Sequence, residues 1–119
     1  MPIRRAEATW KGDLNSGHGW VRSETGAVEG TFSAASRFEE GRGTNPEELL
    51  GAAHAGCFSM AFSLMLSEAG YTAQAIDTTA DVRIEQSGGG FAITQISLST
   101  QADVPGIEEQ EFQAIAEKA

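Results

Sequence analysis

Nucleophilic chemistry is suggested by Cys57, the single cysteine of the 119-residue chain, and by His54, three positions before it. Side chains three positions apart share a face of a helix, so the imidazole could serve as a base for the thiol. The pair alone is weak evidence for a catalytic Cys–His site, because cysteine proteases bring the two groups together from distant segments and add an orienting Asn or Asp. A lone cysteine among Ala, Gly and Phe residues is typical of an inert core side chain. A reactive thiolate would need a cation from elsewhere in the fold.

Two arginines precede this segment and flank the acidic, glycine-containing loop at 39–41. Arg37 lies before the loop and Arg42 follows it. Charges in such a loop commonly form only solvated ion pairs. Metal binding is disfavoured, because His18 is the one histidine besides that of the Cys–His pair, and the remaining ligands would be carboxylates.

The overall composition narrows the function classes. The formal net charge is -9, which argues against nucleic acid or an anionic membrane surface as a partner. One cysteine excludes an internal disulfide framework and any multi-cysteine metal centre. A lone thiol predicts a reducing, cytoplasmic location. The length predicts one domain over residues 1–119.

Alternating apolar and polar residues predict strands in the first third of the chain, at 5–10, 20–23 and 28–32. Residues 33–38 are expected to extend the third strand or to begin a loop. Further strands are predicted at 75–86 and 91–102, followed by a helix from 107 to 119. The apolar phase changes between Ile93 and Ile96, which predicts a bulge or a register step there.

The clearest local signal lies between the two groups of strands. Asn45 is a good N-cap, Pro46 suits the first helical position, and Glu48 can close a capping box. These residues predict a helix from 46 to about 69, ended by Gly70. Leu49 to Leu66 carries no formal charge over 18 residues, the lower limit for a membrane span.

A buried helix in a soluble protein is the preferred interpretation of that run. Glycine, serine and histidine interrupt it, and acidic residues flank it without basic anchors. Because its polarity is low on every face, the helix should be covered on nearly all sides by sheet, by another helix or by a second subunit.

The segment from Gly43 to Ala61, together with Arg37-Phe38, resembles the signature of the OsmC/Ohr family of osmotically induced and organic-hydroperoxide-resistance proteins. The osmotically induced branch is the more similar one. The resemblance continues through 76–82, 90–94 and 104–107, and therefore covers nearly the whole chain. It implies an α+β fold in which an antiparallel sheet wraps a long central helix, assembled as an intertwined homodimer.

By resemblance, the function is that of a bacterial thiol peroxidase that reduces organic hydroperoxides and, less preferentially in some branches, hydrogen peroxide. The resemblance makes Cys57 the attacking thiol, Arg37 the cation that holds it as thiolate, and Glu47 the group that orients the arginine. Apolar side chains around the thiol would favour alkyl or lipid hydroperoxides, unless they are simply core residues: Phe38, Phe58, Met60 and Phe62.

The resemblance further implies a dithiol reductant of the lipoyl type and no metal, flavin or haem cofactor. Family members carry a resolving cysteine beyond the last helix, whereas this chain ends at Ala119 before that point. We therefore expect a single OsmC-like domain without the family's C-terminal segment: either the chain is a fragment of a longer protein, or the protein lacks the usual disulfide step. Two other functions stay open: a catalytically incomplete domain serving as a binding or structural module, and a redox sensor in which oxidised Cys57 signals to a partner.

The spacing of the expected site residues predicts a shared active site. Glu47 and Cys57 are ten residues apart, which is about 15 Å along one helix. That distance is difficult for Glu and Arg side chains to close within one helix. We therefore expect Arg37 and Glu47 to approach Cys57 across a subunit interface of an obligate homodimer.

Overall fold

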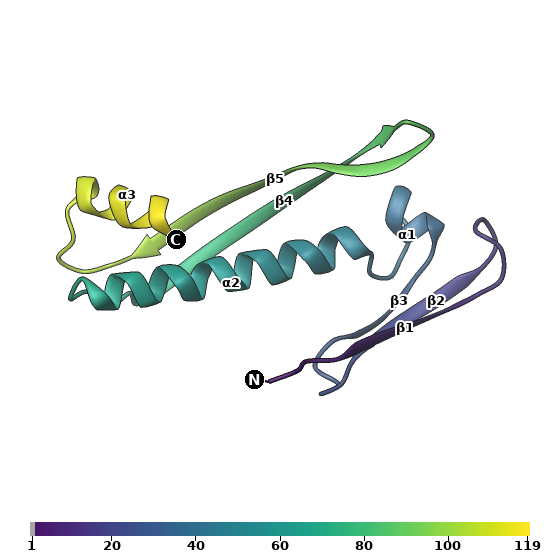
Figure 1. Cartoon of the computed structure of the whole chain (residues 1–119), viewed down its shortest axis with the longest axis horizontal. Coiled ribbons are helices and arrows are strands. Elements are labelled where there is room, and N and C mark those ends of the chain that lie inside the picture. Colours follow the sequence, from purple (N-terminus) through teal and green to yellow (C-terminus); the bar gives the residue numbers. More distant parts are fainter. Residues whose placement is uncertain (1) are drawn as a thin grey trace. The chain divides into compact units, whose positions relative to one another are not determined.

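The computed structural model describes residues 2–119 and is an α+β protein with two antiparallel sheets and one long helix, as the sequence predicts (Figure 1). The chain divides between Leu49 and Leu50 into two compact units, which are described separately below. In chain order, the elements are β1 (Ala6–Lys11), β2 (His18–Ser23), β3 (Glu29–Phe32), α1 (Ala34–Phe38), α2 (Pro46–Glu68), β4 (Ala75–Ser87), β5 (Gly90–Asp103) and α3 (Glu109–Lys118).

The first unit is built on a three-stranded antiparallel sheet in the order β1-β2-β3. Trp10 and Phe32 pack together on one face, with ring centroids 5.4 Å apart. Gly19 lies between them in the ladder, and a Cβ at this position would approach the Phe32 ring to 2.8 Å. Glycine here therefore lets two large rings meet over the central strand.

The short helix α1 is a difference from the sequence expectation for residues 33–38, which was strand or loop. The hydroxyl of Ser33 accepts from the Ser36 backbone N–H at 3.1 Å, and the hydroxyl of Ser36 accepts from the Ser33 backbone N–H at 2.8 Å. This reciprocal cap starts the helix. The expectation was wrong because the usual capping pattern has Glu or Gln at the position that Ser36 occupies here.

Helix α2 begins and ends as predicted. The side-chain oxygen of Asn45 accepts from the backbone N–H of Glu48 at 2.8 Å. The return bond comes from the Asn45 side-chain amide to the Glu48 carboxylate at 2.9 Å, in place of the backbone bond of an ordinary capping box. At the other end Gly70 adopts φ +93°, and the N–H of Tyr71 bonds the carbonyl of Leu66 at 2.9 Å, which closes a Schellman motif.

In the second unit β4 and β5 form a long antiparallel hairpin beside α2 (Figure 1). Arg83 pairs with Gln95 and Ile84 with Ile93, so one residue of β5 is extra. This is the predicted register step, and it keeps apolar side chains on one face of the hairpin despite the change of phase.

The core of the second unit consists of Phe62, Leu66 and Val104. Helix α3 closes it with Phe112, whose ring meets Phe62 edge-on at 5.3 Å. Against the hairpin, α2 approaches closely at Gly51, where a Cβ would lie 3.3 Å from Val82. Apolar side chains of the predicted C-terminal helix therefore cover one end of α2.

Much of the surface of α2 is exposed in the single chain. The helix is long and apolar enough to cross a membrane, and only 17% of its most apolar 18-residue window is buried among the described residues. The expected burial on nearly all sides is thus not provided by one chain. Large apolar side chains on the uncovered face include Leu50, Met60 and Leu64.

Candidate functional site

The best-defined group of expected site residues is the pair Arg37 and Glu47 in the first unit. Arg37 lies in the last turn of α1 and Glu47 in the first turn of α2. Arg37 Nε donates to Glu47 Oε1 and Nη2 donates to Oε2, each at 3.1 Å. The side chain of Glu47 is 9% exposed and that of Arg37 is 38% exposed. Two parallel bonds fix the plane of the guanidinium, which a single contact would leave free to rotate.

The ring of Phe38 is a further contact of the Arg37 guanidinium. The guanidinium carbon of Arg37 is 5.3 Å from the centroid of the Phe38 ring. The face of an aromatic ring attracts a cation, so this contact further restricts the arginine. Phe38 itself is 40% exposed. Its expected role in contacting substrate stays a prediction.

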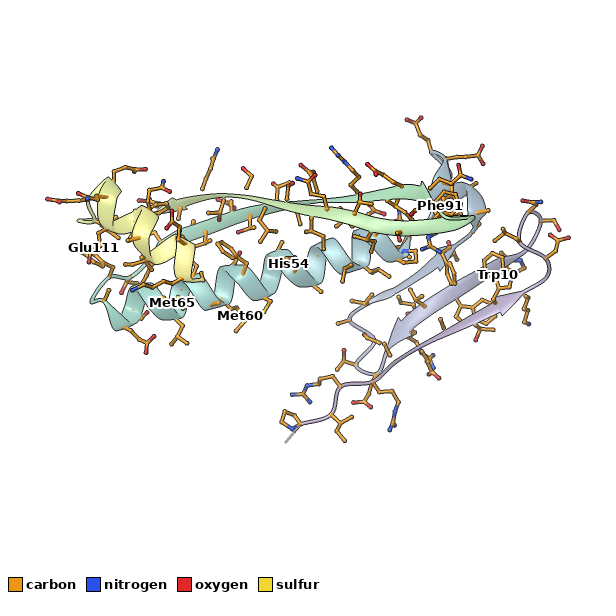
Figure 2. All side chains as sticks on the ribbon, turned by 45° about the horizontal axis from the view of Figure 1, so that its top comes forward. Trp10, His54, Met60, Met65, Phe91 and Glu111 are labelled. Carbon is orange, nitrogen blue, oxygen red and sulfur yellow. The ribbon has the colours of Figure 1, made fainter. Side chains whose placement is uncertain are left out.

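Cys57 lies in the middle of α2 in the second unit, and its side chain is exposed. His54 is exposed on the same helix three residues earlier. Figure 2 shows Met60 on the part of α2 that turns away from the β4–β5 hairpin, and its side chain is 77% exposed. These residues belong to what we call the Cys57 stripe, an exposed line along α2 that comprises Leu50, Ala53, His54, Cys57, Met60 and Leu64.

The two phenylalanines of α2 have different surroundings. Phe62 is fully buried against Leu66 and Val104, which makes it a core residue in the structure. Phe58 is half-buried, and its ring lies 5.9 Å from that of Phe62. Of the apolar residues expected around the thiol, Phe62 is therefore accounted for by packing, whereas Met60 is open to a partner or substrate.

The structure thus brings Arg37, Phe38 and Glu47 together in the first unit. Cys57, Phe58 and Met60 lie on the part of α2 that belongs to the second unit. A contact between Arg37 and Cys57 stays a prediction. Within residues 2–119 there is no group of three or more His, Cys, Asp or Glu side chains arranged to hold a metal ion.

Sequence reasoning missed one residue beside the ion pair. Ser36 is 5% exposed and lies directly before Arg37. Its hydroxyl donates to the carbonyl of Thr44 at 2.8 Å, so it joins α1 to the start of α2. Nothing in the sequence marks this serine, because its importance comes from a contact across eight residues.

Comparison with known proteins relates the whole chain to one family. Residues 39–119 match the family model described as OsmC-like protein. The chain is 50% identical over 117 residues to the peroxiredoxin OsmC of Escherichia coli K12, an alignment that covers 98% of this chain and 82% of that protein.

Comparison with solved structures relates the chain to the same family. A crystal structure of an organic hydroperoxide resistance protein from Elizabethkingia anophelis has a TM-score of 0.67 and 30% identity, with 98% of this chain and 81% of that chain covered. An OsmC-like protein of unknown function from Vibrio cholerae has a TM-score of 0.76, with 99% and 87% covered. At 18% identity, this second likeness concerns the fold alone.

Proposed function

The chain belongs to the OsmC-like protein family, and on that premise we propose that it is a thiol-dependent peroxidase. It reduces organic hydroperoxides, and also hydrogen peroxide, to the alcohol and water through Cys57. The names of its relatives, a peroxiredoxin and an organic hydroperoxide resistance protein, support this activity.

The observation that carries the proposal is the two-point ion pair of Arg37 with Glu47. A guanidinium stays charged at every physiological pH and has five N–H donors. The pair with Glu47 uses two of them, which leaves three for a thiolate and a peroxide oxygen. A cation whose orientation is fixed in advance stabilises the attacking sulfur and the departing oxygen without rearrangement during the reaction.

The proposed reaction has two halves. The Cys57 thiolate attacks the terminal oxygen of the hydroperoxide, the O–O bond breaks, and its electron pair leaves with the alkoxide oxygen, which takes a proton to become the alcohol. Cys57 is thereby oxidised to a sulfenic acid. A dithiol then attacks the sulfenic sulfur and water leaves. Its second thiol displaces Cys57, which returns as a thiolate while the dithiol becomes a disulfide.

A second copy of the chain is the proposed cover of the Cys57 stripe. The stripe combines large exposed side chains such as Met60 and Leu64 with small ones such as Ala53, which allow close helix contact. A long helix whose most apolar 18-residue window is only 17% buried within its own chain is typical of an obligate interface. We further propose that Arg37 and Glu47 of one chain meet Cys57 of the other.

A lipid bilayer is a less suitable cover for the same helix. Its first turn carries Glu47 and Glu48, and its last residue is Glu68, with no basic residue in the last turn. Membrane spans are generally flanked by Lys or Arg on one side. We therefore propose a second copy of the chain, and not a bilayer, as the cover. From the lone thiol and the family resemblance we further propose a cytoplasmic location and a lipoyl-type dithiol as the reductant.

Steady-state turnover tests the function directly. Purified protein is mixed with cumene hydroperoxide and dihydrolipoamide, and loss of peroxide is followed over many turnovers. The wild type should turn over, Cys57→Ser should not, and Ser59→Ala, a hydroxyl change on the same helix, should resemble the wild type. If one equivalent of peroxide oxidises Cys57 but no dithiol supports turnover, the peroxidase activity is contradicted and a redox sensor is favoured.

A further inference from the structure

We infer that Ser36 and Asn45 are positioning residues for the reaction: their crossed hydrogen bonds hold Arg37 against Glu47 in the orientation that the peroxidase site uses. The hydrogen bonds that hold the arginine all lie within the first unit. The expected effect of these bonds on turnover rests on the proposed function.

The need for such a device follows from the chain between the two helices. Arg37 and Glu47 are separated by nine residues, and the loop at 39–43 is exposed throughout. Ordering a flexible loop costs conformational entropy. An ion pair whose arginine is 38% exposed is too weak to hold both helix ends by itself. Other contacts must therefore fix the geometry.

Asn45 supplies the first of these contacts. Its Nδ2 donates to the backbone carbonyl of Ser36 at 3.1 Å and to the carboxylate of Glu48 at 2.9 Å. Its Oδ1 meanwhile accepts from the backbone N–H of Glu48 at 2.8 Å. This arrangement needs two donors and one acceptor, which an amide has and a hydroxyl, with its single donor, does not. Asn45 therefore caps α2 and ties that cap to α1.

Ser36 supplies the return contact. Its hydroxyl donates to the carbonyl of Thr44 at 2.8 Å, while its own backbone carbonyl receives the Asn45 amide. The residue before Arg37 is thus bonded to both residues that precede the first turn of α2. Ser36 is 5% exposed, so water competes poorly for these bonds.

The end of the loop is also anchored to the sheet. The N–H of Thr44 donates to the carbonyl of Thr31, the penultimate residue of β3, at 2.7 Å. Gly43 adopts φ +111°, and a Cβ there would lie 2.6 Å from the same carbonyl. The Ser36–Asn45 linkage is consequently attached to the rigid part of the unit, which is what a positioning device requires.

Two substitutions separate positioning from folding. Asn45→Asp keeps an oxygen to cap α2 but loses the amide bonds to Ser36 and Glu48. Ser36→Ala loses the hydroxyl bond to Thr44 and also the bond from the Ser33 N–H that caps α1. Asn15→Asp and Ser16→Ala make the same chemical changes in the exposed turn between β1 and β2, and serve as matched controls. Circular dichroism and thermal melting establish that each variant is folded; should one not fold, the other carries the test.

The first readout is the exchange of the Arg37 Nε–H with water, measured by NMR. Loss of one ordinary hydrogen bond should speed this exchange by about five- to tenfold in both variants and not in the controls. The second readout is kcat/KM for cumene hydroperoxide, which should fall by a similar factor. The kcat/KM for the dithiol should stay unchanged, because it depends only on the second half of the reaction and the arginine acts on the peroxide step.

The outcomes are distinguishable. An Arg37 Nε–H as protected in both variants as in the wild type would overturn the inference. Faster exchange with unchanged kcat/KM would overturn its catalytic half. A wild type that shows no turnover would defeat the proposed function instead, and the NMR measurement would still decide whether Ser36 and Asn45 hold the arginine.

Discussion

Arg37 and Glu47 are joined by two parallel hydrogen bonds of 3.1 Å although they belong to different helices. The carboxylate is the more buried partner, with 9% of its side chain exposed against 38% for the guanidinium. Glu47 therefore acts as the fixed support and Arg37 as the group presented outward. Removal of the arginine would leave a buried negative charge without its partner, which is costly.

The geometry of this pair predicts that charge alone will not replace Arg37. In Arg37→Lys the positive charge remains, but an ammonium cannot make two parallel bonds to Glu47 and has no planar fork for the sulfur and the peroxide. We expect kcat/KM for cumene hydroperoxide to fall by about 100-fold, the size of loss seen when a preorganised donor is removed. Arg42→Lys in the neighbouring loop is the control and should keep wild-type turnover.

Removal of the Arg37 guanidinium should change the reactivity of the thiol itself. With Arg37→Ala, alkylation of Cys57 by iodoacetamide at mildly acidic pH should slow, because less of the thiol is present as thiolate. The rate is measured by mass spectrometry of the alkylated protein. If wild-type Cys57 is alkylated no faster than a free cysteine under these conditions, the pairing of Arg37 with Cys57 is wrong.

Excess hydroperoxide should drive Cys57 in the 119-residue chain beyond the sulfenic acid. Cys57 is the single cysteine of this chain, so no second thiol of the same chain can capture the intermediate. The expected products are the sulfinic and sulfonic acids, seen as additions of two or three oxygen atoms by mass spectrometry. Prior addition of dihydrolipoamide should prevent them. A long-lived sulfenic acid, or a disulfide between two chains, would contradict the prediction.

A site shared between two chains can be tested by complementation. Cys57→Ser and Arg37→Ala chains are mixed under conditions that allow subunit exchange. In a shared arrangement one site of the mixed dimer carries both substitutions and the other carries neither, so part of the wild-type activity should return. Light scattering checks the dimer at micromolar concentration. No recovery of activity despite proven exchange would show that each site is built by one chain.

Tyr71 gives a pH-dependent prediction for the second unit. Its hydroxyl donates to the Glu111 carboxylate at 2.5 Å, and this bond, helped by the negative charges of Glu111 and Glu108, raises the pKa of Tyr71 above 10.0. The folded chain therefore holds the phenolic proton more tightly than the unfolded chain. The contribution of this bond to the free energy of unfolding is therefore fully present below the unfolded pKa of 10.0. It is lost as the pH rises through the higher pKa of the folded chain.

The measurement is simple because Tyr71 is the single tyrosine of the chain. Tyrosinate absorbance should give a midpoint above 10.0 in the wild type and one closer to 10.0 in Glu111→Gln. Glu117→Gln, on the same helix, is the control. A wild-type midpoint equal to that of Glu111→Gln would show that the bond is not formed in solution.

Truncations at Phe62 and at Met60, two residues apart on α2, should change the free energy of unfolding by very different amounts. Phe62→Ala should lower the free energy of unfolding by about 3–5 kcal/mol, because it removes a fully buried ring. Met60→Ala should have little effect on the core of its own chain, since Met60 is 77% exposed there. Urea unfolding at several protein concentrations separates an effect on the core from an effect on the interface. A loss of unfolding free energy in Met60→Ala that shrinks as the protein concentration rises would indicate that Met60 is buried at the dimer interface.

Sequence reasoning predicted the features that depend on neighbouring residues. Asn45 and Gly70 mark the ends of α2, because a cap and a left-handed turn are set by a few adjacent residues. The step between Ile93 and Ile96 marks the bulge, because side chains alternate with a fixed period along a strand. The single thiol and its helix were likewise evident, and the family resemblance supplied the expected roles of Arg37 and Glu47.

Tertiary structure alone decided which side chains meet. The contacts of Ser36 with Thr44 and Asn45 bring Arg37 to Glu47. Phe62 became core while Met60, two residues away, became surface, although both are apolar. Local pattern could not foresee these outcomes, because the free energy of a buried bond or ring depends on atoms that distant segments bring to it.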